Sequence, residues 1–409
     1  MSDLHASLSG SGSATGGVLL PRSDLGVGWL PHATLHWQEG RISAVVEHSG
    51  PPPPGSPLLV PGLVDLHLHW PQSHVRGQFS GALLPWLRES IWPAEAAFAD
   101  SETAHTRATA FLQATTRAGT CAGMAFGPPF ASASAIFQRL SWRGWLEGPA
   151  LMEVQAPPEL LQETTAVFAQ LCQLPGWQQR RTVVSPRFAP NLTAHSLALC
   201  GATARQAGLA VQSHLSENKD EVAWVAALFP GSLDYTDVYD RAGLLGPHVV
   251  LAHGVHLSDR ELLRLAETGT VVAHCPTSNE ALGSGRMPLE RLRQAGVSWV
   301  LATDIGAGPL LSQFDTMRTF LAIHSELADV SACEALCRAS AVPGQWLAQF
   351  DPGLAGLGSF EVGAPAHVVA LPAAVGDTAE AVLRSVLTAA TAALETLPSA
   401  VWVWGSQAV

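Results

Sequence analysis

Two histidines separated by one residue lie at the end of an apolar segment that runs from Leu59 to Gln72. His67 and His69 have the i, i+2 spacing at which side chains of a strand project from the same face. Their imidazoles can therefore bind one cation together. Further along the chain, other apolar, strand-like runs end near four residues that can bind a metal or carry protons: His214, Glu217, His253 and Asp304.

The elements that must position these residues alternate along the chain. We predict eight strands, at residues 62–68, 119–127, 148–155, 181–187, 208–215, 247–253, 269–275 and 298–304. We predict helices at residues 101–117, 158–173, 193–207, 217–229, 258–267 and 331–349. Near-continuous apolar strands separated by helices are typical of parallel strands that are buried on both faces. Eight of them predict a closed (β/α)8 TIM barrel, in which side chains at the carboxyl ends of the strands meet at one mouth.

The two ends of the chain have a different pattern. Residues 1–16 are rich in Ser and Gly and are expected to form a flexible N-terminus. Residues 17–60 contain short strand-like runs around a turn, and residues 358–409 contain more of them. We predict that 17–60 and 358–409 form a small β-sandwich domain, which leaves 61–357 for the barrel. The predicted class is therefore α/β, a TIM barrel with a β-sandwich built from both terminal segments.

Three imidazoles and one carboxylate suit a divalent ion that keeps an open position for water. We predict that one such ion, zinc in preference to iron(II), is bound by four residues: His67, His69, His214 and Asp304. A bound ion of this kind lowers the pKa of a water molecule to about 7 and so activates it at neutral pH.

Three residues are expected to handle protons in the reaction. Glu217 follows His214 by three positions, where strand gives way to helix, so it can face the same mouth and carry protons to the substrate. His253 is expected to orient or polarise the water, and Asp304 to accept its proton. Many metal hydrolases of this barrel type bridge two ions with a carboxylated lysine on the fourth strand. Lys219 is the only lysine of this chain and lies outside 181–187, which favours a single ion.

Composition excludes several classes of protein. The chain has 409 residues, 47% of them apolar and 14% charged, which suits a large folded core. Its net charge is −12 and its 22 basic residues are scattered, which argues against a nucleic-acid partner. Six cysteines without a C-x-x-C pair suit buried thiols in a reducing compartment. The sequence has no apolar run long enough to span a membrane, and it shows no secretory signal. We therefore expect a cytoplasmic protein with no membrane partner.

Longer blocks of sequence resemble a known family. Four blocks of this chain resemble the amidohydrolase superfamily, and its deaminase branch in particular: His67-Leu-His69, His214-Leu-Ser-Glu217, Leu251-Ala-His253-Gly and Thr303-Asp304. The guanine deaminases are similar in further blocks: Pro71-Gln72, Trp92-Pro-Ala-Glu95, Ser185-Pro-Arg-Phe188, Ser213-His-Leu-Ser-Glu-Asn-Lys-Asp-Glu-Val222 and His274-Cys-Pro-Thr-Ser-Asn279.

This resemblance implies hydrolytic deamination of an amino-purine, guanine to xanthine and ammonia, by a metal-activated water. It implies that Gln72 and Arg187 hold the polar edge of the purine, while Phe188 and Trp92 pack against its face. The chemistry of these side chains is consistent with such roles, because amide and guanidinium groups can donate to a ring carbonyl or nitrogen and an aromatic side chain can pack against a flat base. The resemblance also implies a homodimer that acts on a small heterocyclic substrate.

Other functions stay open at the level of sequence. The block His74-Val-Arg-Gly77 also resembles adenosine-type and chlorotriazine enzymes, so the alternative is a deaminase or chlorohydrolase of another amino-heterocycle, such as an adenine nucleoside, a pterin or a triazine. A catalytically silent barrel that serves as a scaffold is a second alternative, against which Glu217 and His253 argue. A third is an amide-ring hydrolase with two metal ions, which metal content per chain would reveal.

Overall fold

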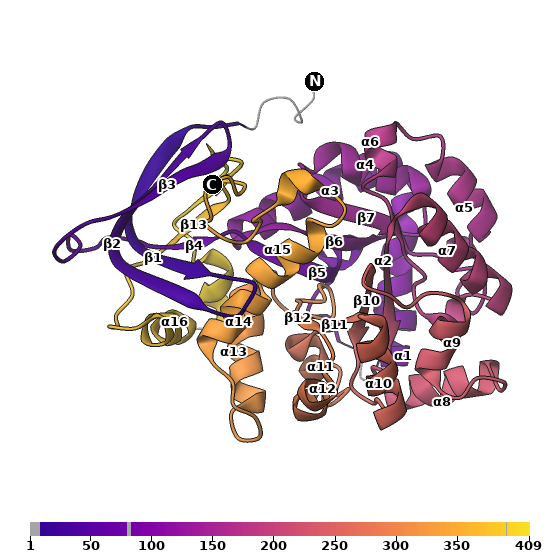
Figure 1. Ribbon diagram of the computed structural model, residues 1–409. Helices are drawn as coiled ribbons and strands as arrows, with labels where there is room; N and C mark the ends of the chain where they lie inside the picture. The colour runs from indigo at the N-terminus through magenta and orange to yellow at the C-terminus, as the bar shows by residue number, and fades with distance from the viewer. Residues whose placement is uncertain (1–8, 80–82, 390) are drawn as a thin grey trace.

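The computed structural model describes residues 9–79, 83–389 and 391–409 (Figure 1). Residues 1–8 of the segment expected to be flexible lie outside this range, and the first strand already begins at Gly12, before the expected boundary at residue 17. Helices surround a central set of strands, and a separate sheet lies to one side (Figure 1). The fold is therefore a mixed α/β fold.

The separate sheet is built from both terminal segments of the chain. Its seven strands lie in the order β15-β14-β13-β4-β1-β2-β3. Their bounds are β1 Gly12–Pro21, β2 Val27–Gln38, β3 Arg41–Glu47, β4 Leu58–Pro61, β13 Val368–Leu371, β14 Ala400–Val403 and β15 Ser406–Gln407. β4 pairs with β1 on one side and with β13 on the other. The described strands here form one sheet, so the predicted two-layered β-sandwich is not confirmed.

Eight parallel strands make up the central part of the structure. They form a three-stranded sheet, β5-β6-β7, and a five-stranded sheet, β12-β11-β10-β9-β8. Their bounds are β5 Leu63–His69, β6 Thr120–Gly127, β7 Trp145–Pro149, β8 Val183–Val184, β9 Ala210–Leu215, β10 Val249–His253, β11 Val271–His274 and β12 Trp299–Leu301. These strands are almost entirely buried, as their continuous apolar sequences predict. Because the described pairings give two sheets, a single closed barrel is not confirmed by them.

The helices of the central part follow the strands. Their bounds are α1 Leu83–Trp86, α2 Trp92–Ala96, α3 Ser101–Arg117, α4 Ala131–Leu140, α5 Thr164–Leu171, α6 Gly176–Gln179, α7 Ala194–Ala207, α8 Lys219–Leu228, α9 Tyr235–Arg241, α10 Asp259–Thr268, α11 Pro276–Ala281, α12 Leu289–Ala295, α13 Gln313–His324, α14 Ala332–Arg338, α15 Ala341–Leu347 and α16 Ala379–Leu387. α10 begins with a capping box, in which the Ser258 side chain accepts from the Glu261 backbone N–H. Among the described residues, no helix has the length and apolar composition needed to span a membrane.

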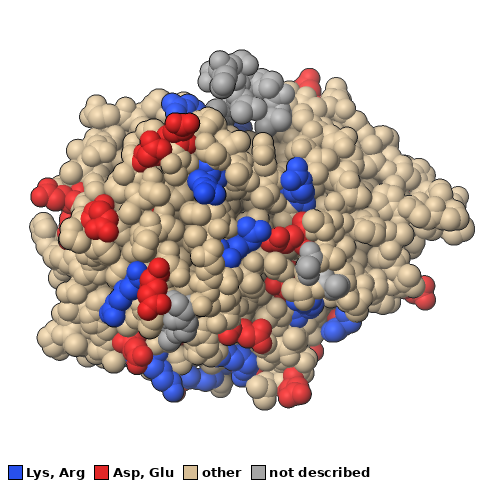
Figure 2. Space-filling model, turned by 180° about the vertical axis from the view of Figure 1, so that it is seen from behind, with Lys and Arg blue, Asp and Glu red and all other residues tan. Residues whose placement is uncertain are grey.

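Charged side chains lie intermixed on the face shown in Figure 2. Several surface arginines pair with a carboxylate, as Arg22 does with Asp24 and Arg384 with Glu380. Pairs of this kind neutralise local charge and contribute little to stability. The mixed signs on this face differ from the clustered basic surface that phosphate backbones require.

Hydrogen bonds connect the first and last of the eight strands at the end where the candidate ligands lie. The Asp65 carboxylate on β5 accepts hydrogen bonds from the Thr303 hydroxyl and backbone N–H, just after β12. It also accepts one from the backbone N–H of His67 at 3.2 Å. The backbone N–H of Asp304 donates to the carbonyl of His67 at 2.9 Å. One buried carboxylate therefore fixes β5 and the segment after β12 relative to each other.

We predict that Thr303→Val destabilises the fold, because it removes the hydroxyl donor to the fully buried Asp65. A buried acceptor that loses its partner costs about 1–3 kcal/mol. The measurement is the urea midpoint of unfolding at constant slope. Thr116→Val is the matched control, since the Thr116 hydroxyl only donates to the carbonyl of Leu112 within its own helix. Equal midpoint shifts for the two variants would contradict the role given to Asp65.

Candidate active site

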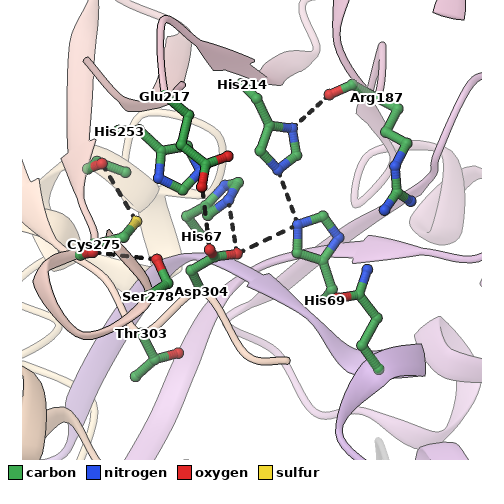
Figure 3. Close-up of polar contacts among 12 residues, drawn as sticks. His67, His69, Arg187, His214, Glu217, His253, Cys275, Ser278, Thr303 and Asp304 are labelled. Atoms are coloured by element: carbon green, nitrogen blue, oxygen red, sulfur yellow. Dashed lines mark hydrogen bonds and ion pairs between the residues drawn. The ribbon is translucent and has the colours of Figure 1, made fainter. Parts of the chain in front are cut away.

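Four predicted ligands come together at the carboxyl ends of the strands. One ligand atom from each of His67, His69, His214 and Asp304 lies within 4.8 Å of all the others. The Nε2 atoms of His69 and His214 are 3.0 Å apart, and those of His67 and His69 lie 3.3 and 3.5 Å from Asp304 Oδ1. Figure 3 shows the three imidazoles directed toward one another and toward Asp304.

Local structure explains this convergence. His67 and His69 lie on β5 at the i, i+2 spacing, and His214 lies on β9. The Nδ1–H of His214 donates to the backbone carbonyl of Arg187, which leaves Nε2 with its lone pair facing the cluster. Asp304 has a φ of 50°, a left-handed conformation that a non-glycine residue adopts at some energetic cost. Strain of this kind is concentrated at functional sites, where surrounding contacts hold it in place.

The burial of the cluster keeps its histidines neutral. Burial lowers the pKa of His67, His69 and His214 well below 6.5. A neutral imidazole is the form that binds a metal ion. Both ring nitrogens of His67 are buried without a hydrogen-bond partner among the described residues. Because buried polar atoms normally have a partner, this donor set fits a divalent cation, which would complete it.

Glu217 and His253 lie beside the cluster, as predicted. His253 Nε2 is 3.5 Å from Glu217 Oε2 and 3.9 Å from Asp304 Oδ2. The Nδ1–H of His253 donates to Asn279 Oδ1 at 2.9 Å, so Nε2 faces the other two groups. Burial, with a smaller contribution from Asp304, raises the pKa of Glu217 to about 8. A carboxyl group with such a pKa can hold and release a proton near neutral pH.

A pocket opens next to these groups. Of the predicted substrate-binding residues, Gln72, Arg187 and Phe188 line it together with His69 and Glu217. Both Gln72 and Arg187 are almost fully buried, at 1% and 3% exposure. Polar groups that remain buried at a pocket wall are suited to fix the orientation of a small ligand.

Trp92 occupies a different place from the other predicted substrate-binding residues. It is buried in an apolar cluster with Trp86 and Leu83, and it is not one of the residues lining the pocket. Trp86 does line the pocket and supplies a second aromatic side chain besides Phe188. The aromatic contact expected from Trp92 is thus offered to the pocket by Trp86 in α1.

Several residues of the site were not identified from the sequence as site residues. Asn279 orients His253, and the Ser284 hydroxyl donates to Glu217 Oε1 at 3.0 Å. Asn279 ends the block His274-Cys-Pro-Thr-Ser-Asn279, so a signal for it was present. Glu95 ends another such block and contacts both Gln72 and Arg187.

Two curated relatives each match somewhat more than three fifths of this chain. The guanine deaminase of Escherichia coli (strain K12) is 36% identical over 268 residues, which are 64% of this chain and 61% of that protein. A probable guanine deaminase of Deinococcus radiodurans is 39% identical over 259 residues, which are 61% of this chain and 59% of that protein. The aligned segment thus spans less than two thirds of the length of either relative.

Similarity in three dimensions extends over nearly the whole chain. The solved structure of E. coli guanine deaminase superposes with a TM-score of 0.85 at 26% identity, over 97% of this chain and 98% of that one. The model of the amidohydrolase family matches residues 58–392, a range that holds all four candidate ligands. The resemblance predicted from the histidine motifs is thereby confirmed, and the chain belongs to the amidohydrolase family.

Proposed function

We propose that this protein is a metal-dependent aminohydrolase that converts guanine and water to xanthine and ammonia. The observation that carries the proposal is one pocket whose wall combines ligands from the His/Asp cluster, the acid–base candidate Glu217 and the pair Gln72 and Arg187. The similarity to guanine deaminases supports guanine as the substrate.

A single divalent ion, zinc in preference to iron(II), is the proposed cofactor. Its ligands are His67, His69, His214 and Asp304, whose atoms already lie together. When bound, such an ion activates a water molecule for attack on the carbon that bears the amine. The fourth strand, Val183–Val184, contains no lysine that could be carboxylated to bridge a second ion. This absence supports one ion per chain.

The side chains divide the remaining work. Glu217 holds a proton near neutral pH and delivers it to the ring nitrogen of the substrate, because its carboxyl faces the pocket. His253, held by Asn279, directs Nε2 toward the site and orients the attacking water. Asp304 accepts the proton that the water loses and passes it to the amine, which leaves as ammonia, while the new hydroxyl returns a proton to Glu217 as it becomes the ring carbonyl.

The substrate is held by polar contacts on its edge and apolar contacts on its face. Gln72 and Arg187 hold the polar edge of the purine from the wall of the pocket. Phe188 lines the same pocket and packs against the face of the purine. Trp92 supports Trp86, a second aromatic residue of the pocket wall, from the apolar cluster that the two tryptophans share. A flat heterocycle between such groups loses water on its faces and keeps hydrogen bonds at its edge.

We also propose that the eight central strands form one closed (β/α)8 barrel beside a terminal domain made of 17–60 and 358–409. The contacts of Asp65 with Thr303 support closure between β5 and β12. The parallel bridge between Glu147 and Thr182 supports closure between β7 and β8. A closed barrel would bring all the strand ends to one mouth, which is where the proposed chemistry requires them.

We expect metal-replete protein to deplete guanine, followed by its ultraviolet absorbance, with xanthine appearing in equal amount. The control reactions contain an adenine nucleoside, a pterin and a chlorotriazine at the same concentration. Absence of guanine turnover, together with rapid conversion of one of these compounds, would contradict guanine as the substrate and identify the alternative.

Replacing Glu217 by Gln should lower kcat about a hundredfold or more, because the amide cannot carry the proton that the carboxyl delivers. Metal content should stay the same, since Glu217 is outside the ligand set. Glu102→Gln, on the exposed side of α3, is the control and should retain full activity. A Glu217→Gln enzyme with wild-type kcat would show that another group carries the proton.

Removal of the metal with a chelator should abolish turnover and lower the unfolding temperature, because an ion bound only by the folded state stabilises it. One equivalent of zinc per chain should restore both properties. The measurements are elemental analysis, calorimetry and the guanine assay on the same samples. Two tightly bound ions per chain would instead favour the two-metal amide-ring hydrolase.

A further inference from the structure

Behind the pocket wall, one buried carboxylate holds the two residues proposed to bind the substrate edge. Glu95 in α2 has no exposed surface. Its Oε1 accepts a hydrogen bond from Gln72 Nε2 at 2.8 Å. The Arg187 Nη1 group contacts both Oε1 and Oε2, each at 2.8 Å. A fully buried carboxylate needs such partners, because burying it unpaired costs a large desolvation energy.

The three residues come from segments that are far apart in the chain. Gln72 ends the short 3-10 helix Trp70–Gln72 that follows β5, and Arg187 follows β8. Both line the pocket, whereas Glu95 does not. Glu95 therefore cannot contact a ligand in the pocket directly, but it sets the positions of two groups that can.

The contacts also determine which atoms face the substrate. A carboxylate accepts hydrogen bonds and does not donate them, so Gln72 must turn its amide nitrogen toward Glu95. Its Oε1 is then left as an acceptor, and among the described residues no side chain or backbone group donates to it. Arg187 uses Nη1 for Glu95, and its Nη2 donates to none of the described residues. One acceptor and one strong donor thus remain available to the pocket.

The backbone of Gln72 is restricted from another side. A Cβ atom built on Gly306 would lie 2.8 Å from Cβ and from the carbonyl oxygen of Gln72. The loop after β12 therefore packs against Gln72 at a distance that only glycine allows. With its backbone packed against Gly306 and its amide bound to Glu95, Gln72 has one orientation that satisfies both contacts.

We propose that Glu95 is a positioning residue that fixes the hydrogen-bonding polarity of the substrate site. With Glu95 in place, the pocket accepts a ring edge that carries an N–H next to a carbonyl or ring-nitrogen acceptor. Such an edge is present in guanine, so the inference rests on the proposed function and deepens it. An amide at position 95 can donate as well as accept, so it allows Gln72 to turn over and present its amide nitrogen to the substrate.

Glu95→Gln keeps the size of the side chain and removes the acceptor-only character. We expect KM for guanine to rise about tenfold or more, with kcat changed far less, because a substrate contact is lost while the acid–base groups stay in place. Glu95→Asp, which keeps the carboxylate, should restore part of the loss. Glu147→Gln is the matched control: Glu147 is equally buried and bonded to Trp70 and Ser134, outside the pocket wall. It should leave KM for guanine unchanged.

A purely structural ion pair would give a different result. In that case Glu95→Gln and Glu147→Gln would both lower the unfolding temperature, and neither would change KM, which would overturn the inference. A double-mutant cycle with Gln72→Ala adds a second kinetic measurement. We expect the effect of Glu95→Gln on KM to shrink when Gln72 is already absent, and full additivity would count against positioning through Gln72.

A crystal structure of metal-loaded Glu95→Ala tests the inference without activity. We expect the Arg187 guanidinium to leave its wild-type position once its anchor is gone. Unchanged positions of both Arg187 and Gln72 would overturn the inference whatever the substrate is. If wild-type protein converts another heterocycle and not guanine, the proposed function fails, and the same kinetic comparison is made with that compound. If Glu95→Ala does not fold, the Glu95→Gln and Glu95→Asp kinetics decide.

Discussion

Four ligand atoms meet within 4.8 Å in a region where burial holds the surrounding histidines neutral. Polar side chains are costly to bury unless they have hydrogen-bond partners. Among the described residues, neither ring nitrogen of His67 has a hydrogen-bond partner. A cation would supply a partner for the one ring nitrogen of His67, Nε2, that faces Asp304, and would stabilise the carboxylate of Asp304 at the same time. The ends of the surrounding strands hold these four atoms together.

Several side chains of the site are oriented by neighbours that lie outside the His/Asp cluster. The carbonyl of Arg187 orients His214, Asn279 orients His253, and Asp65 fixes the end of β5 against Thr303. Such outer contacts set which ring nitrogen carries a proton and how precisely the ligands are placed. Arg187 has a double part in this arrangement, since its backbone orients a proposed ligand while its side chain lines the pocket. The cluster and the proposed substrate site are therefore coupled through one residue.

Periodicity and strand ends were sufficient to predict much of this structure. The helix predicted at 101–117 is confirmed as Ser101–Arg117, where Asp100 caps its first turn. The strand predicted at 148–155 is instead Trp145–Pro149, since beyond Pro149 only Leu151, among the described residues of that run, keeps a parallel bridge to the next strand. The side-chain partners of Glu95 could not be predicted, since Gln72 and Arg187 reach it only through the tertiary fold. Residues whose positions follow from their spacing along a strand, such as His67 and His69, could be predicted. Side-chain contacts between distant segments of the chain could not.

The place of β4 in the terminal sheet has a consequence for biosynthesis. β4 leads directly into β5, which bears His67 and His69, and its two neighbours are β1 and β13. β1 precedes β4 in the chain, whereas β13, which begins at Val368, is made only after all eight central strands. Pairings between such distant segments form late, because the intervening chain must first be ordered. During synthesis, β4, which leads into the strand bearing His67 and His69, therefore stays half paired until the eight central strands have been made.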